Sequence, residues 1–160
     1  MKYILALGVL FLISLQTKGQ NQLNNVEIIT NNNLTYWVMS PEHLENSQTI
    51  SNAIIVRVKS KNSNCTIFAR LTNLSFPSGF SMPSGFIKLD WSYDNSNKDY
   101  NLVTTPISLE TSEKFLFNQK KMPSSVNYYD YYYDLIMTPP AYSMVPGSYS
   151  FNLLFTMTQP

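Results

Sequence analysis

Histidine and cysteine, which most often supply a catalytic base, a nucleophile or a metal ligand, occur once each in this 160-residue chain. The single histidine, His43, lies in the polar segment Glu42–Gln48, and no nucleophile-elbow motif is present. A pair of carboxylates of the glycosidase type would meet only in the folded chain, and nothing in the sequence singles out such a pair. We therefore predict a protein that is not an enzyme and that uses neither a cofactor nor a metal.

The lone Cys65 excludes an intrachain disulfide bond. It begins the alternating segment Cys65–Thr72, in which Ile67, Ala69 and Leu71 share its face. A cysteine on the core face of a strand is expected to be a buried and unreactive thiol. The fold must then be held by its hydrophobic core, and about 140 residues are enough for one ordinary domain.

Charged residues make up only 13% of the chain, while aromatic residues make up 14%. If Lys2 and Lys18 are removed with a signal peptide, nine of the eleven basic residues remain against ten acidic residues. This balance gives no basic surface for nucleic acid or for an anionic membrane. The abundance of aromatic residues is typical of an all-β protein.

The only long apolar run is at the N-terminus, where Lys2 precedes the segment Tyr3–Leu15. That segment is too short for a stable membrane span, and small residues at Thr17 and Gly19 suit a signal-peptidase site. We predict a signal peptide over residues 1–19, cleaved before Gln20, and a single domain over residues 20–160. The mature protein would then be secreted, periplasmic or on the cell surface.

The clearest strand pattern is in the segment Ser148–Thr158, which follows the turn residues Pro146 and Gly147. Successive side chains of a strand point to opposite faces of its sheet. One face of this strand would carry five large apolar side chains, which require a second sheet opposite them. Those residues are Tyr149, Phe151, Leu153, Phe155 and Met157.

Similar alternation elsewhere predicts a single immunoglobulin-like β-sandwich of about seven to nine antiparallel strands. In Thr49–Lys59 the alternation places Ile54, Val56 and Val58 inward and Ile55, Arg57 and Lys59 outward. This segment and Cys65–Thr72 are joined by the short polar turn Lys61–Asn64, which predicts an antiparallel hairpin. Ile87–Tyr93 is a further half-buried strand, with Ile87, Leu89, Trp91 and Tyr93 on one face. Glu42–Gln48 is long enough for one helical turn only.

The tyrosine-rich segment Tyr128–Thr138 supports two interpretations. Tyr128, Asp130, Tyr132 and Asp134 share one face, and the two aspartates indicate that this face is solvated. In the structural interpretation the segment is a strand beside Ser148–Thr158, with tyrosines covering the sheet. In the functional interpretation the four residues form an exposed platform that stacks a sugar ring or docks a partner.

The segment Asp94–Asp99 carries closely spaced oxygen ligands, as a calcium loop does. It lacks the glycine and the bidentate acid of an EF-hand, and Lys98 adds a positive charge. Turn chemistry accounts for the same residues, so we predict a solvated turn without a metal.

Three stretches together, "AIIVRVKS", "CTIFARL" and "VPGSYSFNLLFTMTQ", resemble bacterial pilin-like and spore-coat-U-like exported surface domains. In those domains the last strand follows a turn like Pro146-Gly147-Ser148-Tyr149. The resemblance implies an immunoglobulin-like sandwich, a structural or adhesive role at the cell surface, subunits sometimes joined by strand donation, and no enzymatic activity.

Two functions therefore follow as expectations. The first is a fimbrial-like surface subunit joined by β-augmentation, in which Gln20–Asn33 donates Val26 and Ile28 to an edge strand of a neighbour. Because the chain brings its own final strand, a self-contained domain with partner contacts on its edges and tyrosine face is favoured over obligate strand borrowing. The alternative is a monomeric secreted module that binds carbohydrate or another ligand through Tyr128, Asp130, Tyr132 and Asp134.

Overall fold

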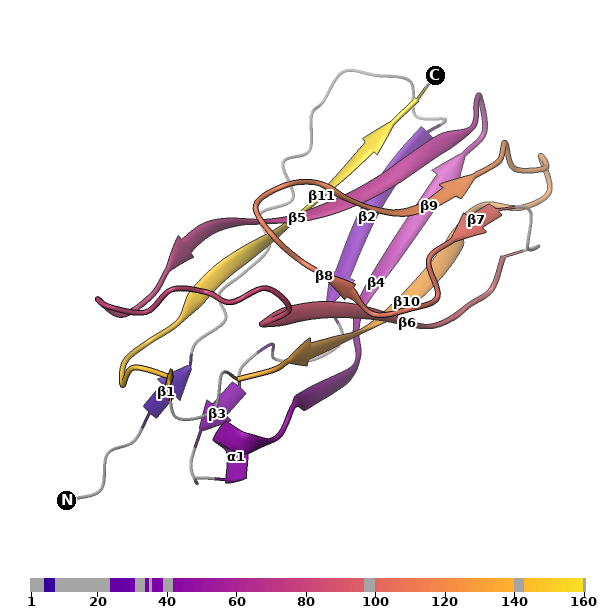
Figure 1. Ribbon diagram of the computed structural model, residues 1–160. Helices are drawn as coiled ribbons and strands as arrows, with labels where there is room; N and C mark the ends of the chain where they lie inside the picture. Colours follow the sequence, from indigo (N-terminus) through magenta and orange to yellow (C-terminus); the bar gives the residue numbers. More distant parts are fainter. Residues whose placement is uncertain are drawn as a thin grey trace.

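Two antiparallel sheets pack face to face, as the alternating apolar pattern predicted (Figure 1). The computed structural model describes residues 5–7, 24–30, 34, 36–38, 42–96, 100–139 and 143–159. The larger sheet has five strands, the smaller has four, and every pairing in both is antiparallel. The prediction of an all-β sandwich is confirmed.

The strands of the five-stranded sheet lie in the order β2 (Asn24–Thr30), β4 (Gln48–Ser60), β10 (Tyr129–Met137), β6 (Ile87–Asp94) and β8 (Ile107–Ser108). Those of the four-stranded sheet lie in the order β11 (Ser150–Thr158), β5 (Cys65–Ser75), β9 (Lys114–Gln119) and β7 (Tyr100–Leu102).

A separate two-stranded sheet pairs β1 (Leu5–Leu7) with β3 (Tyr36–Val38), and α1 (Glu42–Glu45) is the single helical turn expected near His43. Apart from β1, the predicted signal peptide and its cleavage site lie outside the described residues, so the signal peptide stays a prediction. Among the residues that the structure describes, no helix is long and apolar enough to cross a membrane.

The core lies between the sheets and is built from the inward faces that the period of two predicted. Tyr131 of β10 stacks on Phe117 of β9, with ring centroids 3.9 Å apart, and its hydroxyl bonds the side chain of Gln119. Tyr149 is fully buried, and its ring packs against the ring of Phe80 in a T-shaped arrangement with centroids 4.8 Å apart. The contact between Tyr131 and Phe117 joins the two layers, because β10 and β9 lie in different sheets.

The pairing of neighbouring strands differs from two predictions. β4 and β5 do not form a hairpin, because β4 lies in the five-stranded sheet and β5 in the four-stranded sheet. The turn at Lys61–Asn64 carries the chain from one layer to the other. Similarly, β10 is not beside β11 but in the opposite sheet, between β4 and β6. Alternation shows which face of a strand is buried, and it does not show which strand lies next to it.

The edge strands on the two sides of the sandwich differ in length. On one side the edge strands β7 and β8 are only three and two residues long, and Pro106 immediately precedes β8. On the other side the edges are β2, with seven residues, and β11, with nine, and these two strands contact one another (Figure 1). The long edges of both sheets therefore lie on the same side.

Candidate functional site

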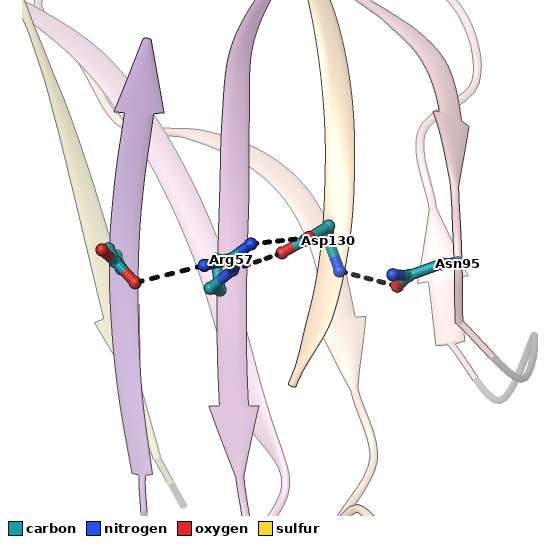
Figure 2. Close-up of polar contacts among 4 residues, drawn as sticks. Arg57, Asn95 and Asp130 are labelled. Carbon is teal, nitrogen blue, oxygen red and sulfur yellow. Dashed lines mark hydrogen bonds and ion pairs between the residues drawn. The ribbon is translucent and has the colours of Figure 1, made fainter. Parts of the chain in front are cut away.

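An ion-paired row crosses the outer face of the five-stranded sheet (Figure 2). The strand register places Arg57 of β4 between Glu27 of β2 and Asp130 of β10. Arg57 donates to both carboxylate oxygens of Asp130, from Nε to Oδ1 at 2.8 Å and from Nη2 to Oδ2 at 3.0 Å. The contact with Glu27 is looser, with Nη1 and Oε2 3.9 Å apart. The bidentate bond to Asp130 is thus the strong member of the row.

Asp130 lies on the outer face as predicted, but its own side chain is buried, with 4% of its surface exposed, so the expectation that Asp130 is itself solvated is wrong. Its main-chain N–H donates to Oδ1 of Asn95 at 2.8 Å, and its carbonyl accepts from the N–H of Asn95 at 3.2 Å. The hydrogen bond to Asp130 raises the pKa of Arg57 above its ordinary value. Each carboxylate oxygen of this buried side chain accepts a hydrogen bond from Arg57, so Asp130 positions the guanidinium.

Two tyrosine rings are exposed beside this row. Tyr93 and Tyr128 expose 46% and 43% of their surfaces, more than any other large apolar side chain among the described residues. Tyr93 stacks against Tyr132 with centroids 4.1 Å apart and an interplanar angle of 11°. The guanidinium carbon of Arg57 lies 4.1 Å from the centroid of the Tyr128 ring, which is a cation–π contact. Each exposed ring therefore rests on a partner that holds it.

Asp134, the fourth predicted residue, has a local structural role. Its Oδ1 accepts the main-chain N–H of Asn52 at 2.7 Å, where Asn52 has a positive φ of 48° and the β4–β10 register shifts. Asp90 lies opposite Asp134 on β6, and burial, followed by the charge of Asp134, raises the pKa of Asp90. Asp134 therefore stabilises a β-bulge.

Sequence reasoning missed Arg57 and Tyr93 as members of this face. The outward position of Arg57 in β4 was visible in the alternation, but its partner is far away in the chain. Tyr93 was placed on the inner face with Trp91. The register pairs Tyr132 with Tyr93 and Tyr133 with Trp91, so Ser92 is an extra residue in β6. This bulge turns Tyr93 outward, as a one-residue insertion must.

The other candidate residues do not form a reactive site. Cys65 is buried, and burial raises the pKa of its thiol. Ser96 donates to Oδ1 of Asp94 from its main-chain N–H at 2.9 Å and from its hydroxyl at 2.7 Å, which is the local turn bonding that was predicted. Residues 97–99 of the proposed calcium loop lie outside the described residues. Across the described ranges, no three acidic, histidine or cysteine side chains are grouped as a metal would require.

The second candidate surface is the edge strand β11. In the part of the chain that the structure describes, β11 pairs with β5 alone. Its sequence, SFNLLFTMT, contains no charged residue and no proline. Phe151 and Leu153 are buried as predicted, whereas Phe155 and Met157 are only half-buried.

Val26 and Ile28, the predicted donor residues, belong to β2, which pairs with β4 over all seven of its residues. Both side chains are half-buried and pack against the core of their own domain. Together with Phe155 and Met157 they form what we call the seam, a set of half-buried apolar side chains on the two adjacent edge strands β2 and β11. The seam lies where a further strand beside β11 would cover it.

No protein-family model matches this chain, and no curated protein matches it. Its function is therefore inferred from the residues of the ion-paired face and of the β11 edge.

Proposed function

We propose that the mature protein is an exported, non-enzymatic structural or adhesive protein of the cell surface that assembles with a second copy of itself through β11. The observation that carries this proposal is the β11 edge: nine residues without charge or proline, paired on one side only among the described residues. The pilin-like resemblance of the sequence supports the same class of function.

A long strand that is paired on one side only, as β11 is among the described residues, is uncommon in proteins that stay monomeric. A free edge presents unpaired N–H and C=O groups, and monomers block it with short strands, lysines, prolines or bulges. The opposite side of this sandwich uses such devices, with the short strands β7 and β8 and with Pro106. The pairing of β11 with β5 is irregular only at its start, between Ser150 and Asn152, and is regular from Asn152 to Thr158. The contrast within one molecule supports a role for β11 in association.

The seam supplies the apolar part of the same interaction. A strand added beside β11 makes main-chain hydrogen bonds, and its alternate side chains cover Phe155 and Met157. Each further square ångström of apolar surface removed from water contributes about 25 cal/mol. The partner is a second copy of β11 in the antiparallel direction, because an uncharged strand does not repel its own copy and a twofold axis closes the assembly.

Strand donation takes a different form from the one expected from the sequence. Donating Val26 and Ile28 to a neighbour would require β2 to leave β4 and uncover the core side of its own sheet. We therefore propose pairing of β11 edges without exchange of β2. Deleting Gln20–Asn33 would remove β2, which pairs with β4 and packs against the core. A loss of assembly could then result from a loss of stability, so we test assembly with a point substitution.

A charge on the edge tests the proposal directly. The mass of residues 20–160 is measured by size-exclusion chromatography with light scattering, for wild type and for Thr156→Lys on β11. Thr72→Lys on the central strand β5 is the matched control, because both threonines are half-exposed in the same sheet. We expect a dimer for wild type and control and a monomer for Thr156→Lys. A monomeric wild type at the highest soluble concentration would overturn the proposal.

The predicted export has its own test. Expression of the full chain in bacterial cells, followed by fractionation and intact-mass measurement, should yield a secreted, periplasmic or surface protein that begins at Gln20. A cytoplasmic protein that retains residues 1–19 would contradict it.

A further inference from the structure

The outer face of the five-stranded sheet belongs to the opposite layer from β11, so a ligand there is independent of assembly. We define the platform as the exposed rings of Tyr93 and Tyr128 with their supports, Tyr132 and Arg57. The rings protrude from a face whose other large apolar side chains are covered. Exposed tyrosines at this density on a folded surface are typical of a recognition site, because their rings are apolar and their hydroxyls form hydrogen bonds.

Each exposed ring of the platform has a supporting contact in the absence of a ligand. Tyr93 is held by its parallel stack with Tyr132, and Tyr128 by the guanidinium of Arg57. Arg57 is fixed in turn by its two hydrogen bonds to the buried Asp130. Side chains that are already immobile lose little conformational entropy on binding, so a weak stacking contact is not offset by the cost of ordering the rings.

Charge decides which class of ligand fits. Nucleic-acid bases also stack on tyrosine, but such sites combine aromatic rings with a positively charged groove. Here the positive charge of Arg57 is neutralised by Asp130. The exposed Glu27 and the partly exposed Lys59 on the same face have opposite charges. The platform therefore has no net positive charge that would favour phosphate, sulfate or carboxylate groups. A neutral ligand with both an apolar face and hydroxyl groups remains.

We propose that the platform binds a neutral oligosaccharide. The C–H faces of two sugar rings stack on Tyr93 and Tyr128, and their hydroxyls bond to the tyrosine hydroxyls and to the exposed side chains of Glu27 and Asn95. Tyr93 lies on β6, whereas Arg57, which supports Tyr128, lies on β4, so the two rings are supported from opposite sides of β10. Neighbouring strands are about 4.8 Å apart, so these supports are two strand spacings from one another. A ligand that contacts both rings is therefore expected to be an oligomer.

Affinity electrophoresis of residues 20–160 in gels containing laminarin, mannan or dextran tests the neutral class, and heparin serves as the acidic comparison. We expect retardation by at least one neutral polysaccharide and none by heparin. In titration calorimetry with oligosaccharides of the retarding polysaccharide, Tyr93→Ala and Tyr128→Ala should each weaken binding about tenfold. Tyr93→Phe and Tyr128→Phe, which keep the rings, should weaken it about threefold or less.

Circular dichroism of each variant confirms that the sheet is intact, which is expected because both side chains are largely exposed. Absence of binding to all three neutral polysaccharides, binding to heparin alone, or binding that survives the double variant Tyr93→Ala/Tyr128→Ala would each overturn the proposal. Thr156→Lys should leave glycan binding unchanged, so failure of assembly and failure of this inference are distinguishable.

Discussion

The hydrogen-bonded pair of Arg57 and Asp130 predicts a large difference between two chemically identical substitutions. Asp130→Asn and Glu27→Gln each replace a carboxylate that faces Arg57 with the amide of the same shape. Asp130 makes two short hydrogen bonds to the guanidinium and is almost fully buried, whereas Glu27 is 3.9 Å away and its side chain is 56% exposed. The ion pair of Arg57 with Asp130 should therefore contribute more to the stability of the fold than the pair of Arg57 with Glu27.

The expected magnitude lies between two limits. Breaking a fully buried ion pair by removing one partner costs about 3–5 kcal/mol, and breaking an exposed pair costs about 0.2–1 kcal/mol. The Arg57 side chain is 29% exposed, so water partly replaces the lost carboxylate, and the asparagine retains one acceptor. We expect Asp130→Asn to lower the free energy of unfolding by about 2 kcal/mol and Glu27→Gln by less than about 0.5 kcal/mol.

Urea unfolding followed by tryptophan fluorescence measures the free energy of unfolding of both variants, since the partly buried Trp91 packs against the core. For a domain of this size 2 kcal/mol corresponds to a fall in melting temperature of about 6 °C. The loss at Asp130 should persist in 1 M salt because the pair is shielded from solvent. Equal losses for the two variants, or a loss below about 0.5 kcal/mol for Asp130→Asn, would refute the reasoning.

Three further predictions concern single residues. Burial and, to a smaller extent, the charge of Asp134 raise the pKa of Asp90, so the charged form of Asp90 destabilises the fold. Asp90→Asn should therefore raise the free energy of unfolding by about 0.5 kcal/mol at pH 7. This gain should fall as the pH is lowered and vanish well below the ordinary aspartate pKa of about 3.9, where the carboxyl is protonated in both states. A gain that does not change with pH in urea titrations would contradict this prediction. Cys65 should resist a disulfide reagent until urea unfolds the protein, because it is buried and its pKa is raised; rapid labelling of the folded chain would contradict this. Gly147→Ala should lower the free energy of unfolding by about 2 kcal/mol, because the φ angle of Gly147 is +152° and the new Cβ would lie 2.5 Å from Cγ of Pro77. An unchanged midpoint in a urea titration would contradict this prediction.

The faces of the strands could be predicted because a period of two is a local property of the sequence. Ile54, Val56 and Val58 of β4 are fully buried, as their alternation required, and so are Tyr131 and Tyr133 of β10. The need for two layers follows from the same pattern, since each strand carries one apolar face that must be covered.

What could not be predicted depends on partners distant in the chain. Arg57 and Asp130 are adjacent in space only because β4 and β10 pair, and alternation contains no information on pairing. An aspartate on the polar side of a strand therefore looks solvated until its arginine is found. The bulge at Ser92 is equally invisible, because the alternation in the sequence continues through the residue that the fold inserts.

The final strand shows how a correct local pattern can support two different conclusions. Its five inward apolar residues suggested a strand that completes its own core. The structure buries the first three and leaves Phe155 and Met157 half-buried beside Val26 and Ile28. The inward side chains of β11 are therefore buried in the first part of the strand and only half-buried in its last part. A solvated edge is under pressure to carry a lysine or a proline, and β11 carries neither along nine residues. An apolar pattern that continues past the point where the described residues cover it is what the proposed pairing with a second β11 requires, and loss of the dimer in Thr156→Lys would connect the two.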